Sequence, residues 1–324
     1  MANNVERVDA LIFIDTNIFL DFYRIRNSDV SMSYLDQIIE HKDIVICGSQ
    51  VEMEYKKNRQ RVVISSIGEI NNKLPTLNLG FPAIIADSQP TKMLEKYKKG
   101  IKDQKKRIKE RVEKVLKNPS RNDQVYRALQ KLWKNNSSYN LNRTNKQRFI
   151  IRELAQKRFM MGYPPRKKGD TSIGDAINWE WIIKCAEVSN KSIIIVSRDQ
   201  DFGSHYGSES FIDDWLLQEF KERTSRKRKL VLTDKLSTAF RMVEIPVTQE
   251  MVNEEEEIIR NVSVHNVISN YLRTIDVLKR NTQLHLPDLS ILDNRLQTNL
   301  SKIATLSEIM KRQSLGFALR SEEE

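Results

Sequence analysis

Residues 9–26 read DALIFIDTNIFLDFYRIR, and this stretch decides the fold. Residues 9–15 contain an unbroken apolar run, flanked by Asp9 and Asp15, that includes β-branched and aromatic side chains. Such a run predicts a short buried strand. From Thr16 onward the apolar residues recur at helical spacing, which predicts a helix directly after the strand. Asp15-Thr16-Asn17 therefore marks the junction between a strand and a helix.

The rest of the chain continues this alternation. Strands are predicted at residues 43–47, 191–196 and 229–232, and helices at 31–41, from Ser49 onward, and at 93–117, 172–190 and 213–223. Ser49 and Glu52 have the spacing of a capping box, which supports the helix start at Ser49. This order predicts an α/β fold, a sandwich in which helices cover a mainly parallel central sheet.

The net charge of +11 on 324 residues is unevenly distributed. Residues 91–170 carry 25 lysines and arginines against 7 acids, a net of +18, which leaves 29 basic and 36 acidic residues, a net of −7, in the remainder. Hydrophobic residues make up 39% of the chain, enough for a real core. The sequence therefore describes an acidic α/β protein with a basic helical insert at about residues 91–170, and an anionic partner is expected.

The long helix predicted at 93–117 has two interpretations. Met93, Tyr97, Ile101 and Ile108 recur at mostly helical spacing, so the helix can pack on this apolar stripe while its lysines are solvated. Alternatively, its basic side chains contact phosphates, which the local net charge favours. The residues expected to bind nucleic acid on this second interpretation are Lys98, Lys99, Lys105, Lys106 and Arg107.

The character of the chain changes after Pro246, which predicts two parts. The α/β domain with its insert is expected at residues 1–246, and a C-terminal helical region at 247–324. An apolar stripe from Leu289 to Met310 recurs every three or four residues. It is expected either to pack back on the main domain or to form a contact surface for a homodimer or a regulatory protein partner.

Several other classes of protein are improbable. The longest apolar runs are too short to cross a bilayer, and the N-terminus lacks the apolar core of a secretory signal. Cys47 and Cys185 have no metal-type spacing, and the four histidines form no recognisable triad or zinc motif. We therefore expect a cytoplasmic protein, with no membrane association, that does not rely on a serine or cysteine nucleophile.

Acidic residues follow the predicted strands or begin the helices next to them. They are Asp15, Glu52, Glu54, Asp175, Asp199 and Asp201. Helix capping would explain each acid taken alone. However, ligands of open α/β sheets gather at the carboxyl ends of the strands, so four segments deliver acids to one edge. Clustered carboxylates repel one another, and a hard divalent cation such as Mg²⁺ or Mn²⁺ relieves that repulsion.

Four motifs carry a resemblance to a known family. IFIDTNIFLDFYR, SQVEMEYKKNR, GDAINWEWIIKCA and IIIVSRDQDF occur in the order and spacing seen in PIN-like domains, and the larger bacterial members have a helical insert between the second and third motifs. The resemblance covers roughly residues 9–245 and implies a PIN-like α/β/α sandwich. It also implies an acidic quartet of Asp15, Glu54, Asp175 and Asp199, with Asp201 as a peripheral metal-binding acid and Asn17 as the polar partner of Asp15.

Residues beside these motifs are expected to have supporting roles because of their positions. Asn58 and Arg59 lie one turn beyond Glu54 and are expected to orient it or to reach phosphate. Lys167, Lys168 and Arg198 flank acidic motifs and are expected to bind nucleic acid, with ordinary solvated charge as the alternative.

The resemblance implies a Mg²⁺- or Mn²⁺-dependent nuclease, most often an endoribonuclease, in which an activated water attacks phosphorus in line. A role as a toxin or phage-defence effector is compatible with this chemistry. The alternatives are a DNA nuclease, which would use the same residues, and a non-catalytic nucleic-acid-binding or assembly protein that keeps the fold.

Overall fold

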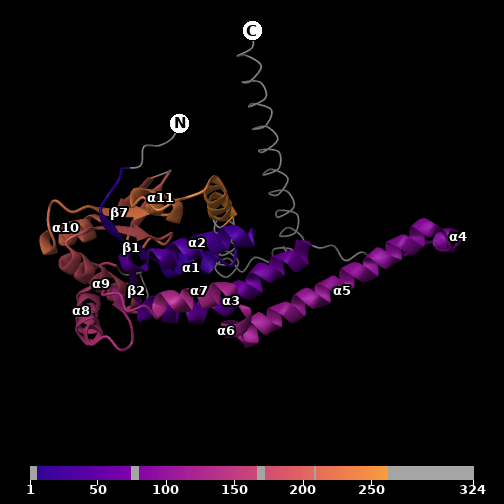
Figure 1. Ribbon diagram of the computed structural model, residues 1–324, viewed down its shortest axis with the longest axis horizontal. Helices are drawn as coiled ribbons and strands as arrows, with labels where there is room; N and C mark the ends of the chain where they lie inside the picture. Colours follow the sequence, from indigo (N-terminus) through magenta and orange to yellow (C-terminus); the bar gives the residue numbers. More distant parts are fainter. Residues whose placement is uncertain (1–5, 74–79, 166–171, 208, 262–324) are drawn as a thin grey trace, which may run out of the picture. The chain divides into compact units, whose positions relative to one another are not determined.

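A computed structural model describes residues 6–73, 80–165, 172–207 and 209–261. Those up to Arg260 belong to one compact unit, Met1–Arg260. Its centre is an all-parallel sheet with the strand order β3-β2-β1-β4-β7, flanked by helices (Figure 1). The strands are β1 (Ala10–Ile14), β2 (Val45–Gly48), β3 (Asn140–Leu141), β4 (Ser192–Val196) and β7 (Leu230–Thr233). This architecture confirms the predicted α/β sandwich with a parallel sheet.

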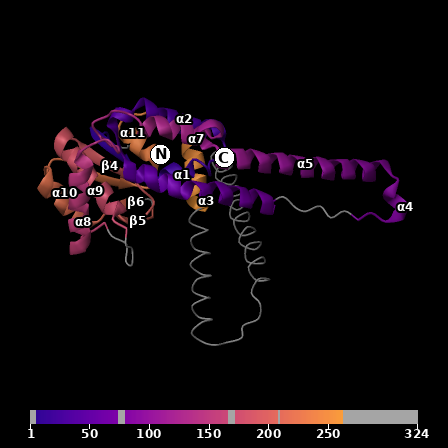
Figure 2. The same ribbon diagram turned by 90° about the horizontal axis from the view of Figure 1, so that it is seen from below.

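The remaining elements connect these strands. The helices are α1 (Thr16–Asp21), α2 (Ser28–Glu40), the 3₁₀ turn η1 (Lys42–Ile44), α3 (Ser49–Lys73), α4 (Ala83–Ala86), α5 (Gln89–Lys117), α6 (Pro119–Asn122), α7 (Gln124–Trp133), α8 (Gln147–Met161), α9 (Gly174–Ser189), α10 (Asp214–Arg223) and α11 (Leu236–Met242). A separate antiparallel hairpin consists of β5 (Gly203–Tyr206) and β6 (Glu209–Ile212). Helices α8, α9 and α10 lie side by side (Figures 1 and 2).

The two central strands explain why the opening stretch decides the fold. All five residues of β1 and all five of β4 are buried, as expected for parallel strands covered by helices on both faces. They pair in register from Ala10 opposite Ser192 to Ile14 opposite Val196. The residues that follow both strands therefore emerge next to each other at one edge.

The chain order makes that edge a natural ligand site. From β1 the chain passes to β2 on one side, whereas β4 pairs with the other side of β1. The strand order thus reverses between β1 and β4, and open α/β sheets bind ligands at such switch points, outside the carboxyl ends of the strands. Asp15 follows β1 there, and Ser197, Arg198 and Asp199 follow β4.

The basic insert contains one long helix, α5, as predicted. It begins at Gln89 rather than Met93, because Ser88 caps it and Pro90 is tolerated in the first helical turn. Its apolar stripe is not covered along the first two thirds of the helix, where Met93, Tyr97, Ile101 and Ile108 remain 39–58% exposed. Only the end of the stripe, near Val115, is half-buried, so packing on the whole stripe does not account for this helix.

The compact unit continues past Pro246. Residues 249–261 are helical, and the Tyr34 hydroxyl donates a hydrogen bond of 3.0 Å to the Met251 carbonyl oxygen. The carboxylate of Glu255 is buried and accepts from the backbone N–H groups of Leu236 and Ser237, at 2.6 and 3.0 Å. The predicted stripe at Leu289–Met310 lies outside the described residues.

None of the described helices has the length and apolar character that crossing a bilayer requires.

Candidate active site

Asp15 is the centre of the carboxylate group at the switch point. Its side chain is buried and accepts three hydrogen bonds, from the Thr16 N–H at 2.6 Å, the Ser197 hydroxyl at 2.6 Å and the Asn17 amide at 2.9 Å. Because Thr16 is the first residue of α1, the same carboxylate also caps this helix. Capping and a place in the acidic site are thus combined in one side chain, with Asn17 as its polar partner.

The surroundings of Asp15 make its negative charge costly. The pKa of its carboxyl is raised from 3.8 to about 7, mainly by burial and in part by the negative charges of Asp199 and Glu54, although the hydrogen bonds from Ser197 and Thr16 act in the opposite direction. The structure therefore brings Asp15, Asp199 and Glu54 close enough to interact electrostatically.

Glu54 reaches this group from the second turn of α3. One of its carboxylate oxygens accepts from the Thr16 hydroxyl at 3.0 Å, and the other accepts from the Gln50 amide at 2.6 Å. Thr16 therefore links Glu54 to the backbone that follows β1, which fixes two of the four predicted acids relative to each other.

Asp175 belongs to the first turn of α9, which packs tightly against Glu54. A methyl group added at Gly174 would lie 2.5 Å from the Glu54 carboxylate and 2.6 Å from the Gln50 amide. Only a glycine allows α9 to begin this close to Glu54. Gly174 therefore places the start of α9, which carries Asp175 as its next residue, against Glu54.

The loop after β4 carries the remaining acids and a residue that the sequence analysis missed. The Ser197 hydroxyl donates to Asp15 and accepts from the Asp199 N–H at 3.1 Å, so it joins the two strand ends. Ser197 is fully buried, Asp199 is exposed and Asp201 is buried. The signal for Ser197 was its place directly after the apolar run of β4.

The structure gives Asn58 and Arg59 contacts away from the Glu54 carboxylate. The Asn58 amide donates to the backbone carbonyl of Glu54 at 3.0 Å. The Arg59 guanidinium is buried against Asp123, at 2.6 Å, and donates to the Val115 carbonyl at 2.9 Å. Arg59 thus ties α3 to the end of α5 and the start of α7, which favours a structural role over the predicted phosphate contact.

Arg198 is also held inside the protein. Its guanidinium donates to the Asp234 carbonyl at 3.1 Å and forms ion pairs with Asp21 and Glu255. Burial is the main influence on this group, and it lowers the pKa of Arg198. These contacts favour a role in fixing the loop that carries Asp199.

The other predicted nucleic-acid contacts fall in two places. Lys99, Lys106 and Arg107 are exposed on α5, and Lys98 and Lys105 are half-buried there. Lys167 and Lys168 lie outside the described residues.

The donor chemistry of the edge suits a hard divalent cation. Carboxylates from three separate segments interact electrostatically there, and Mg²⁺ and Mn²⁺ prefer oxygen ligands. Within the described residues, no three Asp, Glu, His or Cys side chains lie close enough together to hold a metal ion as they stand. A cation would oppose the like charges that raise the pKa of Asp15, so the chemistry of the donors, rather than their spacing as it stands, suits a divalent ion.

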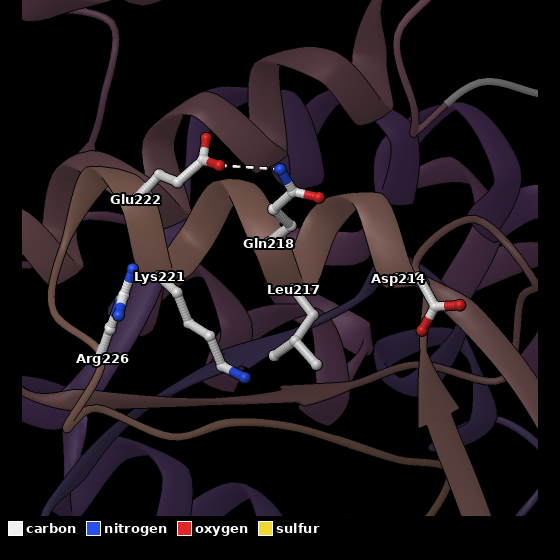
Figure 3. Close-up of a pocket in the computed structure, with 6 residues that line it drawn as sticks. All are labelled: Asp214, Leu217, Gln218, Lys221, Glu222 and Arg226. Atoms are coloured by element: carbon white, nitrogen blue, oxygen red, sulfur yellow. Dashed lines mark hydrogen bonds between the residues drawn. The ribbon is translucent and has the colours of Figure 1, made fainter.

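A surface pocket of about 660 Å³ lies elsewhere, along α10 (Figure 3). It is lined by Asp214, Leu217, Gln218, Lys221, Glu222 and Arg226. Two of these already bond to each other, because the Gln218 amide donates to Glu222 at 2.8 Å. Ligand pockets are predominantly apolar, and this lining is not. The carboxylate edge is therefore the better candidate for the active site.

A parallel α/β fold with carboxylates gathered at its switch point defines a class of protein suited to metal-assisted chemistry on phosphates. A family model described as PIN domain matches residues 12–202, which is more than half of the chain. The chain belongs to the PIN domain family, a nuclease-type family whose members generally use divalent metals. No curated protein and no solved structure matches it.

The electrostatics of Asp15 predict a pH-dependent stability. The folded state binds the Asp15 proton more tightly than the unfolded state, so this contribution is fully present below about pH 4 and is lost as the pH rises through about 7. A shift from 3.8 to about 7 corresponds to roughly 4 kcal/mol. The free energy of unfolding, measured by urea denaturation in EDTA, should therefore rise for Asp15→Asn relative to the wild type as the pH increases from 5 to 8. A difference between these two free energies that stays the same from pH 5 to 8 would contradict the raised pKa of Asp15.

Proposed function

We propose that this protein is a Mg²⁺- or Mn²⁺-dependent endoribonuclease that hydrolyses phosphodiester bonds at the carboxylate edge of the sheet. The observation that carries the proposal is the meeting of Asp15, Glu54 and Asp199 at the switch point, with the start of α9 pressed against Glu54. RNA is favoured over DNA because the motifs resemble a family in which endoribonucleases are the most common members.

The proposed metal ligands are Asp15, Glu54, Asp175 and Asp199, with Asp201 at the periphery. When bound, a divalent ion supplies an activated water and neutralises charge on the phosphoryl group. The protein's own contribution is to hold the ligands in place. Ser197 and Asn17 orient Asp15, and Thr16 and Gln50 hold the two oxygens of Glu54.

Substrate binding is assigned to α5. This helix carries 12 basic and 4 acidic residues, and most of its side chains are exposed. It is connected to the site through α3, which carries Glu54 and, through Arg59, holds the end of α5. A basic surface on a helix whose end is held to the helix that carries Glu54 would bind the phosphates of the strand that is cut.

Two further assignments belong to the proposal. We place the nuclease domain at residues 1–246, including the basic insert, and assign the helical region at 247–324 a role in contacts with a second copy or a regulatory protein. The helix that begins at residue 249 would be the part of this region that packs on the domain. A toxin or phage-defence effector would need such regulation.

The test is a substrate and metal panel. Purified protein is incubated with labelled single-stranded RNA, tRNA, and single- and double-stranded DNA in Mg²⁺, Mn²⁺ or EDTA. We expect internal cleavage of RNA in either metal and none in EDTA. Cleavage of DNA alone would support a DNA nuclease, whereas binding without metal-dependent cleavage of any substrate would support the non-catalytic alternative.

The role of α5 gives a second prediction. Changing Lys98, Lys99, Lys105, Lys106 and Arg107 to Gln should weaken binding and lower the slope of log affinity against log salt by about 0.7 for each phosphate of a single strand that is no longer neutralised. Binding would be measured by fluorescence anisotropy at several salt concentrations. Lys42→Gln with Lys227→Gln, two exposed lysines outside the insert, provides the control. An unchanged slope would favour the interpretation in which the basic side chains of α5 are solvated and contact no phosphates.

A further inference from the structure

Tyr163 and Trp215 form an exposed aromatic pair. Tyr163 follows α8 and Trp215 is the second residue of α10. Their ring centroids are 5.4 Å apart, with 40° between the ring planes. Although the rings contact each other, Tyr163 remains 37% exposed and Trp215 48% exposed. The chain has four tryptophans, and the other three, Trp133, Trp179 and Trp181, are buried.

A buried network of charges holds this pair in one orientation. Arg158, near the end of α8, forms ion pairs with Glu180 of α9 and Glu219 of α10, and its guanidinium donates to the Pro164 carbonyl at 2.5 Å. The Tyr163 N–H donates to the Arg158 carbonyl at 3.1 Å, across the left-handed turn at Gly162, φ 75°. Arg158 therefore fixes the backbone around Tyr163 and links it to the helix that carries Trp215.

The pair lies at the same edge of the sheet as the carboxylates. α9 and α10 each precede a parallel strand, β4 and β7, so both helices begin at the edge where the strands end. The start of α10 is also tied to the acidic loop, because the Asp213 N–H donates to the Phe202 carbonyl at 2.9 Å, one residue after Asp201.

The local charge favours the base over the phosphate as the group that contacts these rings. Asp213 and Asp214 directly precede Trp215, and their negative charge repels phosphates. An exposed indole and phenol offer π-faces on which any nucleobase can stack, and such stacking needs a base that is free of a duplex.

We propose that Tyr163 and Trp215 are a stacking platform for one unpaired base of the bound strand. This inference rests on the proposed nuclease function, because it assumes that a nucleic acid strand runs along the carboxylate edge. The strand's phosphates contact the basic insert and one of its bases stacks on the aromatic pair.

The experiment uses the full chain with Asp15→Asn, so that the strand is bound without being cut. A short RNA is added single-stranded or annealed to its complement, and tryptophan fluorescence and anisotropy are recorded. Since Trp215 is the exposed tryptophan, we expect the single strand to quench the fluorescence. Trp215→Ala should weaken single-strand affinity about 5- to 100-fold, in line with the stacking of one base. Trp215→Phe should retain most of this affinity, and duplex affinity should not change.

Phe149→Ala is the matched control, because Phe149 is an aromatic residue of α8 that is 59% exposed and lies near the opposite end of that helix. It should bind like the parent. Equal single-strand affinity for the parent and Trp215→Ala, or a loss shared with Phe149→Ala, would overturn the platform.

Cleavage assays with protein that keeps Asp15 separate the two proposals. If the wild type cleaves RNA and Trp215→Ala raises KM with little change in kcat, both stand. If the wild type cleaves and Trp215→Ala has an unchanged KM, the platform fails while the nuclease stands. If nothing is cleaved but single strands still bind in a Trp215-dependent way, the platform stands and the nuclease fails.

Discussion

Asp15→Asn should lower the rate of RNA cleavage by about a thousandfold or more while leaving the protein folded. A carboxylate ligand that is lost from a metal site removes several kcal/mol of transition-state stabilisation, and about 4 kcal/mol corresponds to a factor of 10³ in rate. Asparagine preserves the shape of the side chain, its one oxygen can still accept from the Thr16 N–H, and its NH₂ group can donate to the Ser197 hydroxyl oxygen, so the fold should tolerate the change.

The measurement is single-turnover cleavage of a labelled RNA in Mg²⁺, with the thermal melt recorded for each variant. Asp175→Asn should lose activity similarly, whereas Asp36→Asn, which changes an exposed acid of α2, should cleave like the wild type. Because the Asp15 charge is costly when buried, Asp15→Asn should also melt at a higher temperature than the wild type in EDTA at pH 8. Cleavage that survives either site substitution would rule out the assigned ligands.

The sequence predicted the elements that depend on local pattern. The runs at residues 9–15 and 191–196 became β1 and β4, because an unbroken apolar run has few stable positions other than a buried parallel strand. Once both strands are placed in one sheet, geometry alone brings the residues after them together. For this reason the proximity of Asp15 and Asp199 was predictable without knowledge of any side-chain contact.

The sequence did not predict features that depend on distant partners or on weak local pattern. Ser197 lies 182 residues from Asp15, to which it donates. Its place directly after β4 predicts that it lies near Asp15, but no local pattern predicts this hydrogen bond. The strand β3 has only two residues, and the hairpin β5–β6 is polar, so neither shows a periodic apolar signal.

Arg59 illustrates the same difficulty for charged residues. Its position one turn after Glu54 suggested a contact with phosphate. Its partner, Asp123, is 64 residues away in the sequence, so the local pattern could not distinguish a solvated arginine from a buried ion pair.

We expect Arg59→Ala to destabilise the protein by about 3–5 kcal/mol, because it removes one partner of a buried ion pair and leaves the other charge unpaired. Both side chains are only 3% exposed. Asp123 would retain the hydrogen bond from the Tyr23 hydroxyl, at 2.6 Å, and that from the Tyr126 N–H, at 3.0 Å, but no positive charge would face it. The decrease in the free energy of unfolding would be measured by urea denaturation.

A double replacement separates the charge from the packing. Arg59→Met with Asp123→Leu removes both charges and keeps apolar volume, so it should recover much of the stability that either single change costs. Surface pairs contribute only about 0–1 kcal/mol, which makes Lys184→Ala, whose exposed side chain pairs with Glu187 at 3.2 Å, a suitable control. A decrease below about 1 kcal/mol for Arg59→Ala would mean that the arginine is solvated, as the phosphate-binding interpretation requires. If instead the large decrease is found, the end of α5 is held to α3 by Arg59, and weakened RNA binding in this variant would follow from the loosened insert rather than from the removal of a group that binds phosphate.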